Sequence, residues 1–348
     1  MMKELYGFEL LGALSDAFSP SGNERVVLEL IKGQVEQYCD EVYFDVVGNL
    51  ICKISTPKKY AKKTLFCAVA DECGFMVKDI DDGGRLSIAA LGGLDTALLS
   101  ARKVTVGYGE KTTVGVVSSK PIHSLSSDER SKPTPIKQIY IELGTDSKEE
   151  TEKLVKTGDL GTFRSKAENF GDGMFKGKAL EYRVGCAVLC ELIRKVNKEN
   201  IDRDLYFAFT TLGATGMRNT GASVAANVIK PDNSYVFGGL GACDVYGAKG
   251  SDVVCKLGDG VIVSISDGRT IYAPKQTSEL TEKLASLGIQ TQPNRSNAGG
   301  GIEAEIQKCC GGVRVTSVKI PVRYPRTASC LINKKDYESM LASAEACL

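Results

Sequence analysis

The chain has 348 residues and is 43% hydrophobic, which is enough for a large core and, at roughly 100–200 residues per domain, for two domains. Its 44 basic and 43 acidic residues leave a formal net charge of +1, so we expect neither nucleic acid nor a membrane surface as a partner. No run approaches the roughly 18 apolar residues of a membrane span, and no apolar signal core begins the chain, so a cytoplasmic protein is expected.

Cysteine and histidine usage restricts the chemistry. The 12 cysteines are scattered without a CxxC pair and sit mostly in apolar runs, which favours reduced core residues. Cys186 and Cys190, one helical turn apart, and the adjacent Cys309 and Cys310 are the pairs that a soft metal or a redox couple would need. The single histidine, His123, is fewer than the two or three that catalytic zinc sites usually take. Any Ser-His-Asp or Cys-His nucleophile would also have to use it.

Hydrophobic spacing predicts the elements of the first fifth of the chain. In order, they are a helix over 4–17, an amphipathic helix over 21–38, a β-hairpin over 41–54 and a buried strand over 63–70. Ser21 stands three residues before Glu24, which is the spacing of a capping box at the start of the second helix. Gly48 and Asn49 mark the turn of the hairpin.

The hydrophobic pattern of the sequence changes after Asp71, which predicts an inserted domain. Over 73–170, short alternating segments separated by Gly, Asp and Pro are typical of a small β-barrel, with one helical stretch at 148–155. Beyond it, helix and strand alternate again. The expected helices are 184–196, 216–228, 278–287 and 335–346, and the expected strands are 205–211, 235–239, 261–265 and 313–320. We therefore predict an α/β domain of residues 1–72 plus 171–348, with helices on both faces of its sheet, interrupted by a β domain of residues 73–170.

Charged residues at element ends are the candidate site. Asp71 and Glu72 directly follow the strand over 63–70, where open α/β sheets place their ligands, although solvated acids at a turn would look the same. Glu181 and Arg183 precede the helix expected at Val184, either as site residues or as a helix-start acid with a neighbouring Arg.

The last third of the chain adds two more candidates. Arg323 and Arg326 follow the strand over 313–320 and could hold a carboxylate or phosphate, or simply lie on the surface. The run 299–301 is three glycines without a P-loop Lys or dinucleotide spacing, so it is a weak nucleotide signal and equally a flexible loop.

Short motifs along nearly the whole chain resemble the tetrahedral aminopeptidases, metallopeptidase family forty-two, which includes glutamyl aminopeptidases, FrvX and cellulase M. The matching segments are 19–24 (SPSGNE), 45–50 (DVVGNL), 71–77 (DECGFMV), 92–95 (GGLD), 119–123 (SKPIH), 141–149 (IELGTDSKE) and 320–324 (IPVRY). The resemblance implies a zinc-peptidase-like α/β sandwich with an inserted, PDZ-like β-barrel dimerisation domain. It also implies a shell of twelve subunits and removal of N-terminal residues from peptides by two bridged ions, usually zinc or cobalt.

The same resemblance implies that most of the family's site residues are replaced. The family's positions fall on Val69 (first ligand His), Asp71 (orienting Asp, kept), Glu181 (bridging Asp), Gly213 (general base Glu), Ala214 (ligand Glu), Gly238 (strand-end Asp) and Arg326 (final His). The family's GGTDA becomes 300–304, with Glu303 in place of Asp. Two divalent ions need several anionic or imidazole ligands, and water activation needs a base. We therefore predict no catalytic metal, no cofactor and no peptidase activity of the family type.

Three functions remain open from the sequence. The first is an inactive homologue with a structural, regulatory or binding role in an oligomeric shell, alone or mixed with an active paralogue. Arg326 would then enter the space between Asp71 and Glu181 and neutralise both as a buried ion pair. The second is an active hydrolase with a rebuilt metal site that holds zinc, cobalt or a harder ion. Its ligands would be carboxylates or thiolates drawn from Asp71, Glu72, Glu181, Asp244, Glu303, Cys67, Cys186 and Cys243.

The third is a metal-free pocket for an anionic small molecule or a peptide carboxylate. Arg323, Arg326 and the glycines 299–301 would line it. Glu72, Arg183 and Glu303 are its further expected residues.

Overall fold

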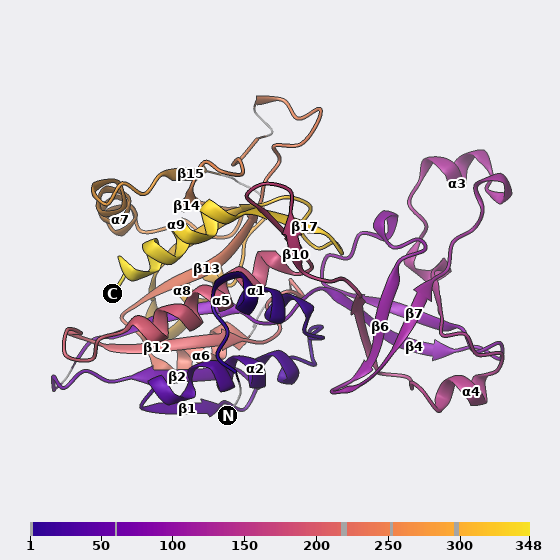
Figure 1. Ribbon diagram of the computed structural model, residues 1–348, viewed down its shortest axis with the longest axis horizontal. Helices are drawn as coiled ribbons and strands as arrows, with labels where there is room; N and C mark the ends of the chain where they lie inside the picture. Colours follow the sequence, from indigo (N-terminus) through magenta and orange to yellow (C-terminus); the bar gives the residue numbers. More distant parts are fainter. Residues whose placement is uncertain (1–2, 60, 217–220, 251–252, 296–298) are drawn as a thin grey trace.

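The computed structural model describes residues 3–59, 61–216, 221–250, 253–295 and 299–348. A small β-barrel lies to one side of a larger α/β body, which contains the C-terminus (Figure 1). The structure confirms the expected fold class of an α/β protein with an additional small barrel. Within the described residues, no helix is long and apolar enough to cross a membrane.

An eight-stranded sheet forms the centre of the α/β body. Its strands, in spatial order, are β1 (Glu41–Phe44), β2 (Leu50–Ile54), β12 (Asp204–Thr210), β3 (Lys63–Val69), β13 (Asn233–Gly241), β16 (Arg314–Val322), β14 (Val261–Ser266) and β15 (Thr291–Arg295). The four middle strands β12, β3, β13 and β16 run parallel. Their apolar character follows from burial on both faces, as in other parallel sheets.

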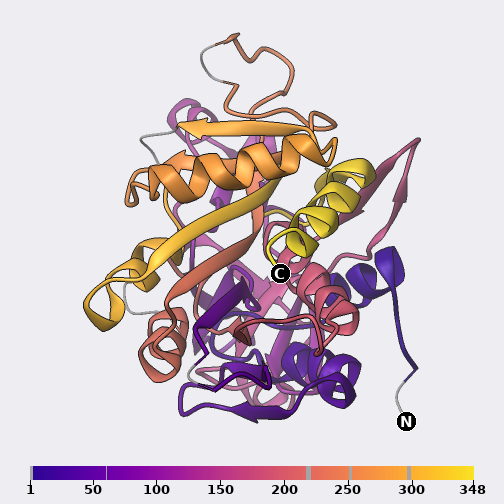
Figure 2. The same cartoon turned by 90° about the vertical axis from the view of Figure 1, so that its left-hand side faces the viewer.

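Helices cover both faces of this sheet, as the alternation of helix and strand predicts. One face packs against α1 (Gly7–Asp16), α2 (Arg25–Val35), α5 (Leu180–Lys195), α7 (Pro274–Ser286) and α9 (Lys334–Glu345), and the other against α6 (Gly221–Ile229) and α8 (Glu303–Gln307). Figure 2 shows α5 and α9 on one side of the twisted sheet and α6 and α8 on the other. Short 3₁₀ turns follow α2 and α8, at η1 (Glu36–Tyr38) and η6 (Cys309–Gly311).

The second unit is a closed six-stranded barrel with its own apolar core. Its strands, in spatial order, are β4 (Gly74–Ile80), β5 (Leu86–Leu91), β8 (Tyr140–Glu142), β7 (Lys111–Val117), β6 (Lys103–Tyr108) and β9 (Leu160–Phe163). Its connections carry η2 (Thr96–Leu98), η3 (Ile122–Ser124), α3 (Ser127–Ser131), η4 (Ile136–Gln138) and α4 (Lys148–Glu152). The ring of Phe75 lies directly over Gly161, where a Cβ would come within 2.1 Å of it, so the two strands approach closely only because residue 161 is glycine.

A three-stranded sheet follows the barrel and joins it to the C-terminal part of the α/β body. It consists of β10 (Glu168–Phe170), β11 (Met174–Gly177) and β17 (Cys330–Asn333). Because β17 directly precedes α9, this sheet holds the segment after β16 against the segment that leads into α5.

Two expected helix starts are wrong. The capping box at Ser21 does not form, because α2 begins at Arg25 and the Ser21 hydroxyl donates to Oδ2 of Asp71 instead. Helix α5 begins at Leu180 rather than near Val184, so Glu181 and Arg183 lie inside its first turn. The helix expected over 216–228 corresponds to α6 from Gly221, and residues 217–220 lie outside the described residues.

Candidate functional site

The carboxyl ends of the four parallel strands meet at one edge of the sheet, where doubly wound folds hold their ligands. The strand register pairs Thr210 with Val69 and Gly238 with Lys319, and the pairing of Phe237 with Ala68 brings Gly238 beside Val69. Thr210, Val69, Gly238 and Lys319 thus form one row across β12, β3, β13 and β16. This row, called here the strand-end row, faces the side of the sheet that α6 and α8 cover. It contains one cation and no carboxylate or imidazole.

Asp71 lies just beyond the row and is fully buried. Its Oδ1 accepts a hydrogen bond from the Gly213 amide at 2.8 Å, and its Oδ2 accepts from the Ala214 amide at 2.9 Å and from the Ser21 hydroxyl at 2.5 Å. Burial, reinforced by the charge of Glu24, raises the pKa of Asp71 to about 7 against the effect of these donors. Both oxygens therefore hold the loop after β12 in place.

Glu181 is held by the backbone of Arg326, not by its guanidinium. Oε1 of Glu181 accepts from the Arg326 amide at 2.7 Å, and Oε2 accepts from the Cys330 thiol at 3.3 Å. Burial raises the pKa of Glu181. The Arg326 side chain packs over Gly93 of the barrel, where a Cβ would come within 2.2 Å of its Nη1.

The expected ion pair of Arg326 with Asp71 and Glu181 is therefore wrong. Among the described side chains, Arg326 has no carboxylate oxygen within 4.0 Å. The reason is the backbone of this loop: Arg326 has a positive φ of +63°. In that conformation its amide points at Glu181 while its side chain leaves toward the barrel.

Glu72 and Arg183 belong to a buried structural cluster. Oε1 of Glu72 pairs with Nζ of Lys178 at 2.5 Å and lies 3.6 Å from Nη2 of Arg183. Oε2 of Glu72 accepts from the Thr162 hydroxyl of the barrel at 3.1 Å. Arg183, with no exposed surface, donates to the backbone oxygens of Leu14, Ala70 and Asp71. These side chains join the barrel to the α/β body rather than lining an open pocket.

Glu303 is paired with the cation of the strand-end row. Its Oε1 lies 2.7 Å from Nζ of Lys319 and accepts from the Ser317 hydroxyl at 2.9 Å. Burial would raise the pKa of Glu303, but the charge of Lys319 outweighs it and holds that pKa below its ordinary value. Oε1 of Glu303 thus faces the ammonium of Lys319, which lies beside Gly238.

The other expected site residues lie apart. Arg323 forms a bidentate pair with Asp244, with both distances 2.8 Å. Gly300 packs on the side chain of Arg269, and His123 is exposed in η3 of the barrel segment. The pocket predicted from Arg323, Arg326 and residues 299–301 is thus not assembled.

The thiols and carboxylates predicted to rebuild a metal site do not converge either. The Cys186 thiol donates to the Val69 carbonyl at 3.2 Å, burial raises the pKa of Cys67, and Cys243 is exposed. Over the ranges that the structure describes, no three His, Cys, Asp or Glu side chains are grouped so as to hold a metal ion.

Sequence reasoning missed two features of the site. One is Lys319, whose signal was a single charge between Val318 and Ile320 in a strand that is otherwise buried after Arg314. The other is Cys73, whose Sγ lies 3.6 Å from the Tyr182 hydroxyl and 3.5 Å from the Ala214 carbonyl, and whose pKa burial raises to about 11. The space left among Cys73, Glu181, Arg326 and their neighbours is about 10 Å³, close to the least that holds one water.

Several residues with left-handed backbone conformation lie around Glu181. Ala179, Leu212, Tyr324 and Arg326 have φ between +54° and +63°, a conformation that L-residues other than glycine adopt at a cost of about 1–2 kcal/mol. They precede α5, follow β12 and follow β16, which are the three segments around Glu181. Strain of this kind is concentrated at functional sites in proteins. Strained backbone therefore surrounds Glu181 on three sides.

Comparison with known proteins identifies relatives of the whole chain. The family model described as M42 glutamyl aminopeptidase matches residues 48–342. A candidate aminopeptidase of Acetivibrio thermocellus is 32% identical over 323 residues, covering 93% of this chain and 92% of its own. The TET aminopeptidase from a marine sediment Thaumarchaeota archaeon superposes with a TM-score of 0.91 at 29% identity, covering 97% of this chain and 94% of that one.

A further solved relative is an assembly. The Pyrococcus horikoshii TET1 peptidase, which assembles into a tetrahedron or a large octahedral shell, superposes with a TM-score of 0.86 at 25% identity. The match covers 97% of this chain and 98% of that one. The fold is thus shared over nearly the full length of both.

Proposed function

The chain belongs to the M42 glutamyl aminopeptidase family, and from that premise we propose that it is a member without the family's metal-dependent hydrolysis, acting as a structural, regulatory or binding subunit of a homo-oligomeric shell. The resemblance places the family's ligands and base at positions that in this chain lie at the carboxyl edge of the central sheet. The proposal rests on what those positions now hold.

The strand-end row carries the proposal. Where two divalent ions would need anionic or imidazole ligands, the row holds Val69 and Gly238, and beside them a partly buried Lys319. The Lys319 ammonium lies 2.7 Å from Oε1 of Glu303. Because this ammonium engages Oε1 of Glu303, that oxygen is not free to bind a metal ion.

The remaining carboxylates do not fit the group either. Asp71 already accepts three hydrogen bonds, from Ser21, Gly213 and Ala214. Glu181 accepts from the Arg326 amide and the Cys330 thiol. Freeing either one for a metal would leave buried donors without acceptors, at a cost of about 1–3 kcal/mol each. The residues present therefore do not fit two bridged ions, and no hydrolytic step is derived through them.

Assembly is the function that the chain retains in this proposal. We assign residues 73–170 to the inserted dimerisation domain, because the closed barrel is built from strands within that range. Val114 and Val116 on β7 and Ile122 in η3 expose 40%, 46% and 72% of their surface, which suits a partner copy. TET relatives form closed shells with the same fold.

The proposal is tested by metal content together with hydrolysis. The protein is incubated with zinc or cobalt, desalted and measured by plasma mass spectrometry, then assayed on a panel of aminoacyl-nitroanilides beside a metal-loaded TET aminopeptidase. We expect well under one ion per chain and no turnover above the blank. One or two ions per chain with metal-dependent turnover would establish the alternative of a rebuilt hydrolase site.

The oligomeric state is tested separately by size-exclusion chromatography with multi-angle light scattering of the native protein at micromolar concentration. We expect particles of twelve times the 37.3 kDa chain mass, or of the dimer from which such a shell is built. A monomer at micromolar concentration would contradict the shell. In the variant Val116→Lys, the like charges of two copies should shift the distribution toward smaller species, whereas Lys78→Gln on β4 should leave it unchanged.

A further inference from the structure

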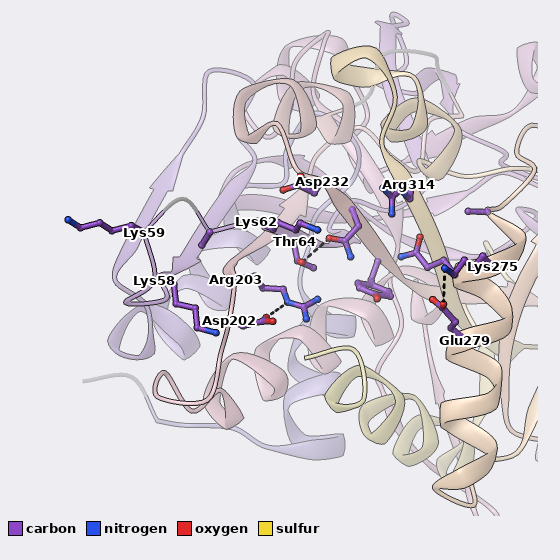
Figure 3. A pocket seen from close by; sticks show the side chains of 15 residues that line it. Lys58, Lys59, Lys62, Thr64, Asp202, Arg203, Asp232, Lys275, Glu279 and Arg314 are labelled. Carbon is purple, nitrogen blue, oxygen red and sulfur yellow. Dashed lines mark hydrogen bonds and ion pairs between the residues drawn. The ribbon is translucent and has the colours of Figure 1, made fainter.

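A cleft lies at the end of the parallel strands that is opposite the strand-end row. It has a volume of about 910 Å³, within the range of small-molecule sites. Its floor is made by the first residues of β3, β13 and β16, and its walls by the loop before β3, the turn before β12 and the first turn of α7 (Figure 3). None of the residues discussed for the candidate site lines it.

The cleft is strongly basic in a chain that is nearly neutral. Its lining includes six cations, Lys58, Lys59, Lys62, Arg203, Lys275 and Arg314, against three carboxylates. This net charge of +3 compares with +1 for the entire chain. Figure 3 shows Lys62, Arg203 and Arg314 directed into the cleft from separate elements, whereas Lys59 points away from it. A concave surface with one sign of charge concentrates ligands of the opposite sign.

The carboxylates of the cleft are already engaged. Asp202 pairs with Arg203 at 2.7 Å, and Glu279 lies 3.8 Å from Lys275. Asp232 accepts from the Lys63 amide at 2.8 Å. In the part of the chain that the structure describes, Lys58, Lys62 and Arg314 have no carboxylate oxygen within 4.0 Å, so their charges are available to a ligand.

The start of α7 adds neutral donors and one unmet acceptor. This 13-residue helix begins with Pro274 after Ala273, which provides no side-chain cap, and Ala273, Lys275 and Gln276 line the cleft, so the positive end of the helix dipole lies beside it. The side-chain oxygen Oε1 of Gln276 is buried in the cleft wall, and no described residue donates a hydrogen bond to it. A ligand that suits these groups carries an anion, and the rest of the cleft has room for an organic part beside Gln276.

We propose that this cleft binds a phosphorylated small molecule, with the phosphate held by Lys62, Arg314 and the first turn of α7 and the organic part meeting Gln276. Phosphate fits better than a carboxylate, because its oxygens can accept from an Arg fork, an ammonium and helix amides at once. The organic part occupies the remaining volume of the cleft, beside Gln276. The site is independent of the proposed function, since it uses none of the same residues.

The test is isothermal titration calorimetry of the full protein at 150 mM salt. The probes are AMP and glucose 6-phosphate, each against its phosphate-free parent, together with inorganic phosphate, citrate and a Glu-rich peptide. We expect one phosphate ester per chain, bound at least about tenfold more tightly than the parent compound and than inorganic phosphate. Preference between AMP and glucose 6-phosphate distinguishes a nucleotide from a sugar phosphate.

Variants locate the binding. Lys62→Gln and Arg314→Gln should each weaken the bound ester by about tenfold or more, because each removes a charge-assisted hydrogen bond. Lys308→Gln, an exposed cation outside the cleft, removes the same charge and should leave the affinity unchanged. Circular dichroism melts check that all three variants fold.

Three results would overturn the proposal. The first is that no phosphate compound binds saturably. The second is that citrate, the acidic peptide or inorganic phosphate binds as tightly as the esters. The third is that Lys308→Gln weakens binding as much as the cleft variants do.

Discussion

The side chain of Val69 occupies the space in which a side chain at position 213 would begin. A Cβ built on Gly213 comes within 2.7 Å of both Cγ1 and Cγ2 of Val69, a distance that real Cβ atoms essentially never show. By the family resemblance these two positions carry a ligand His and the general base Glu. In this chain the valine and the glycine fit each other, so a side chain cannot be restored at position 213 without a clash unless Val69 changes as well.

We expect Gly213→Ala to destabilise the protein by about 1–3 kcal/mol, because the added methyl group overpacks against Val69. In a Val69→Ala background the same change should cost less than half as much, since both Cγ atoms are gone. Urea unfolding of the four proteins in this cycle measures the coupling. Gly83→Ala, whose Cβ would meet nothing closer than 3.5 Å, is the control. Equal costs in the two backgrounds would contradict the contact.

Arg326→Ala should change the free energy of unfolding by less than about 1 kcal/mol, because no carboxylate lies within ion-pair distance of its side chain. Arg326→Gly should be neutral or stabilising, since glycine adopts φ of +63° without strain. Glu181→Ala, in contrast, should cost about 1–3 kcal/mol by leaving the Arg326 amide without its acceptor. Guanidinium chloride unfolding ranks the three. A larger loss of unfolding free energy for Arg326→Ala than for Glu181→Ala would support an ion pair of Arg326 with Asp71 and Glu181.

Lys319→Met should destabilise the protein by about 3–5 kcal/mol, because it leaves Glu303, only 1% exposed, as an unpaired buried charge. The double variant Lys319→Met/Glu303→Leu should recover most of that loss, since it removes both charges. Thermal and urea unfolding of the single and double variants provide the comparison. If the double variant is as unstable as Lys319→Met, the cost arises from packing and not from the orphaned carboxylate.

The burial of Asp71 predicts a pH dependence of stability. Its folded pKa of about 7 lies above the value of about 3.9 in unfolded chains, so between these values the folded state binds the extra proton. The resulting stabilisation is complete below the unfolded pKa and is lost as the pH rises through about 7, with a steepest slope of about 1.4 kcal/mol per pH unit.

The measurement is the difference in unfolding free energy between the wild type and Asp71→Asn from pH 5 to 8. Asparagine keeps the shape of the side chain but has no titration, so this contribution should move against the wild type as the pH rises. Asp79→Asn, an exposed position on β4, removes a carboxylate outside the buried site and serves as the control. A difference for Asp71 that moves in favour of the wild type at high pH would show that its three donors outweigh its burial.

The sequence by itself determined the local elements and the relationship. Alternation and helical spacing report which side of each segment is buried, and they place β3, the hairpin of β1 and β2, and the helix α9 within a few residues of their observed bounds. The short motifs from 19–24 to 320–324 identified the family, because so many motifs in the same order rarely arise by chance. Val69, Gly213 and Arg326, which the family resemblance implies are replacements, can also be read directly from the sequence.

Only the tertiary structure decided what those replacements do. The strand-end row exists because the sheet order brings β13 between β3 and β16, and no local pattern reports which strands are neighbours. That order brings Lys319 beside Gly238, and the packing of α8 against β16 brings Glu303 to it. The direction of the Arg326 side chain depends on a left-handed residue in a loop, where spacing carries no information. Local sequence limits burial within an element, but side chains from distant elements meet only where long-range packing brings those elements together.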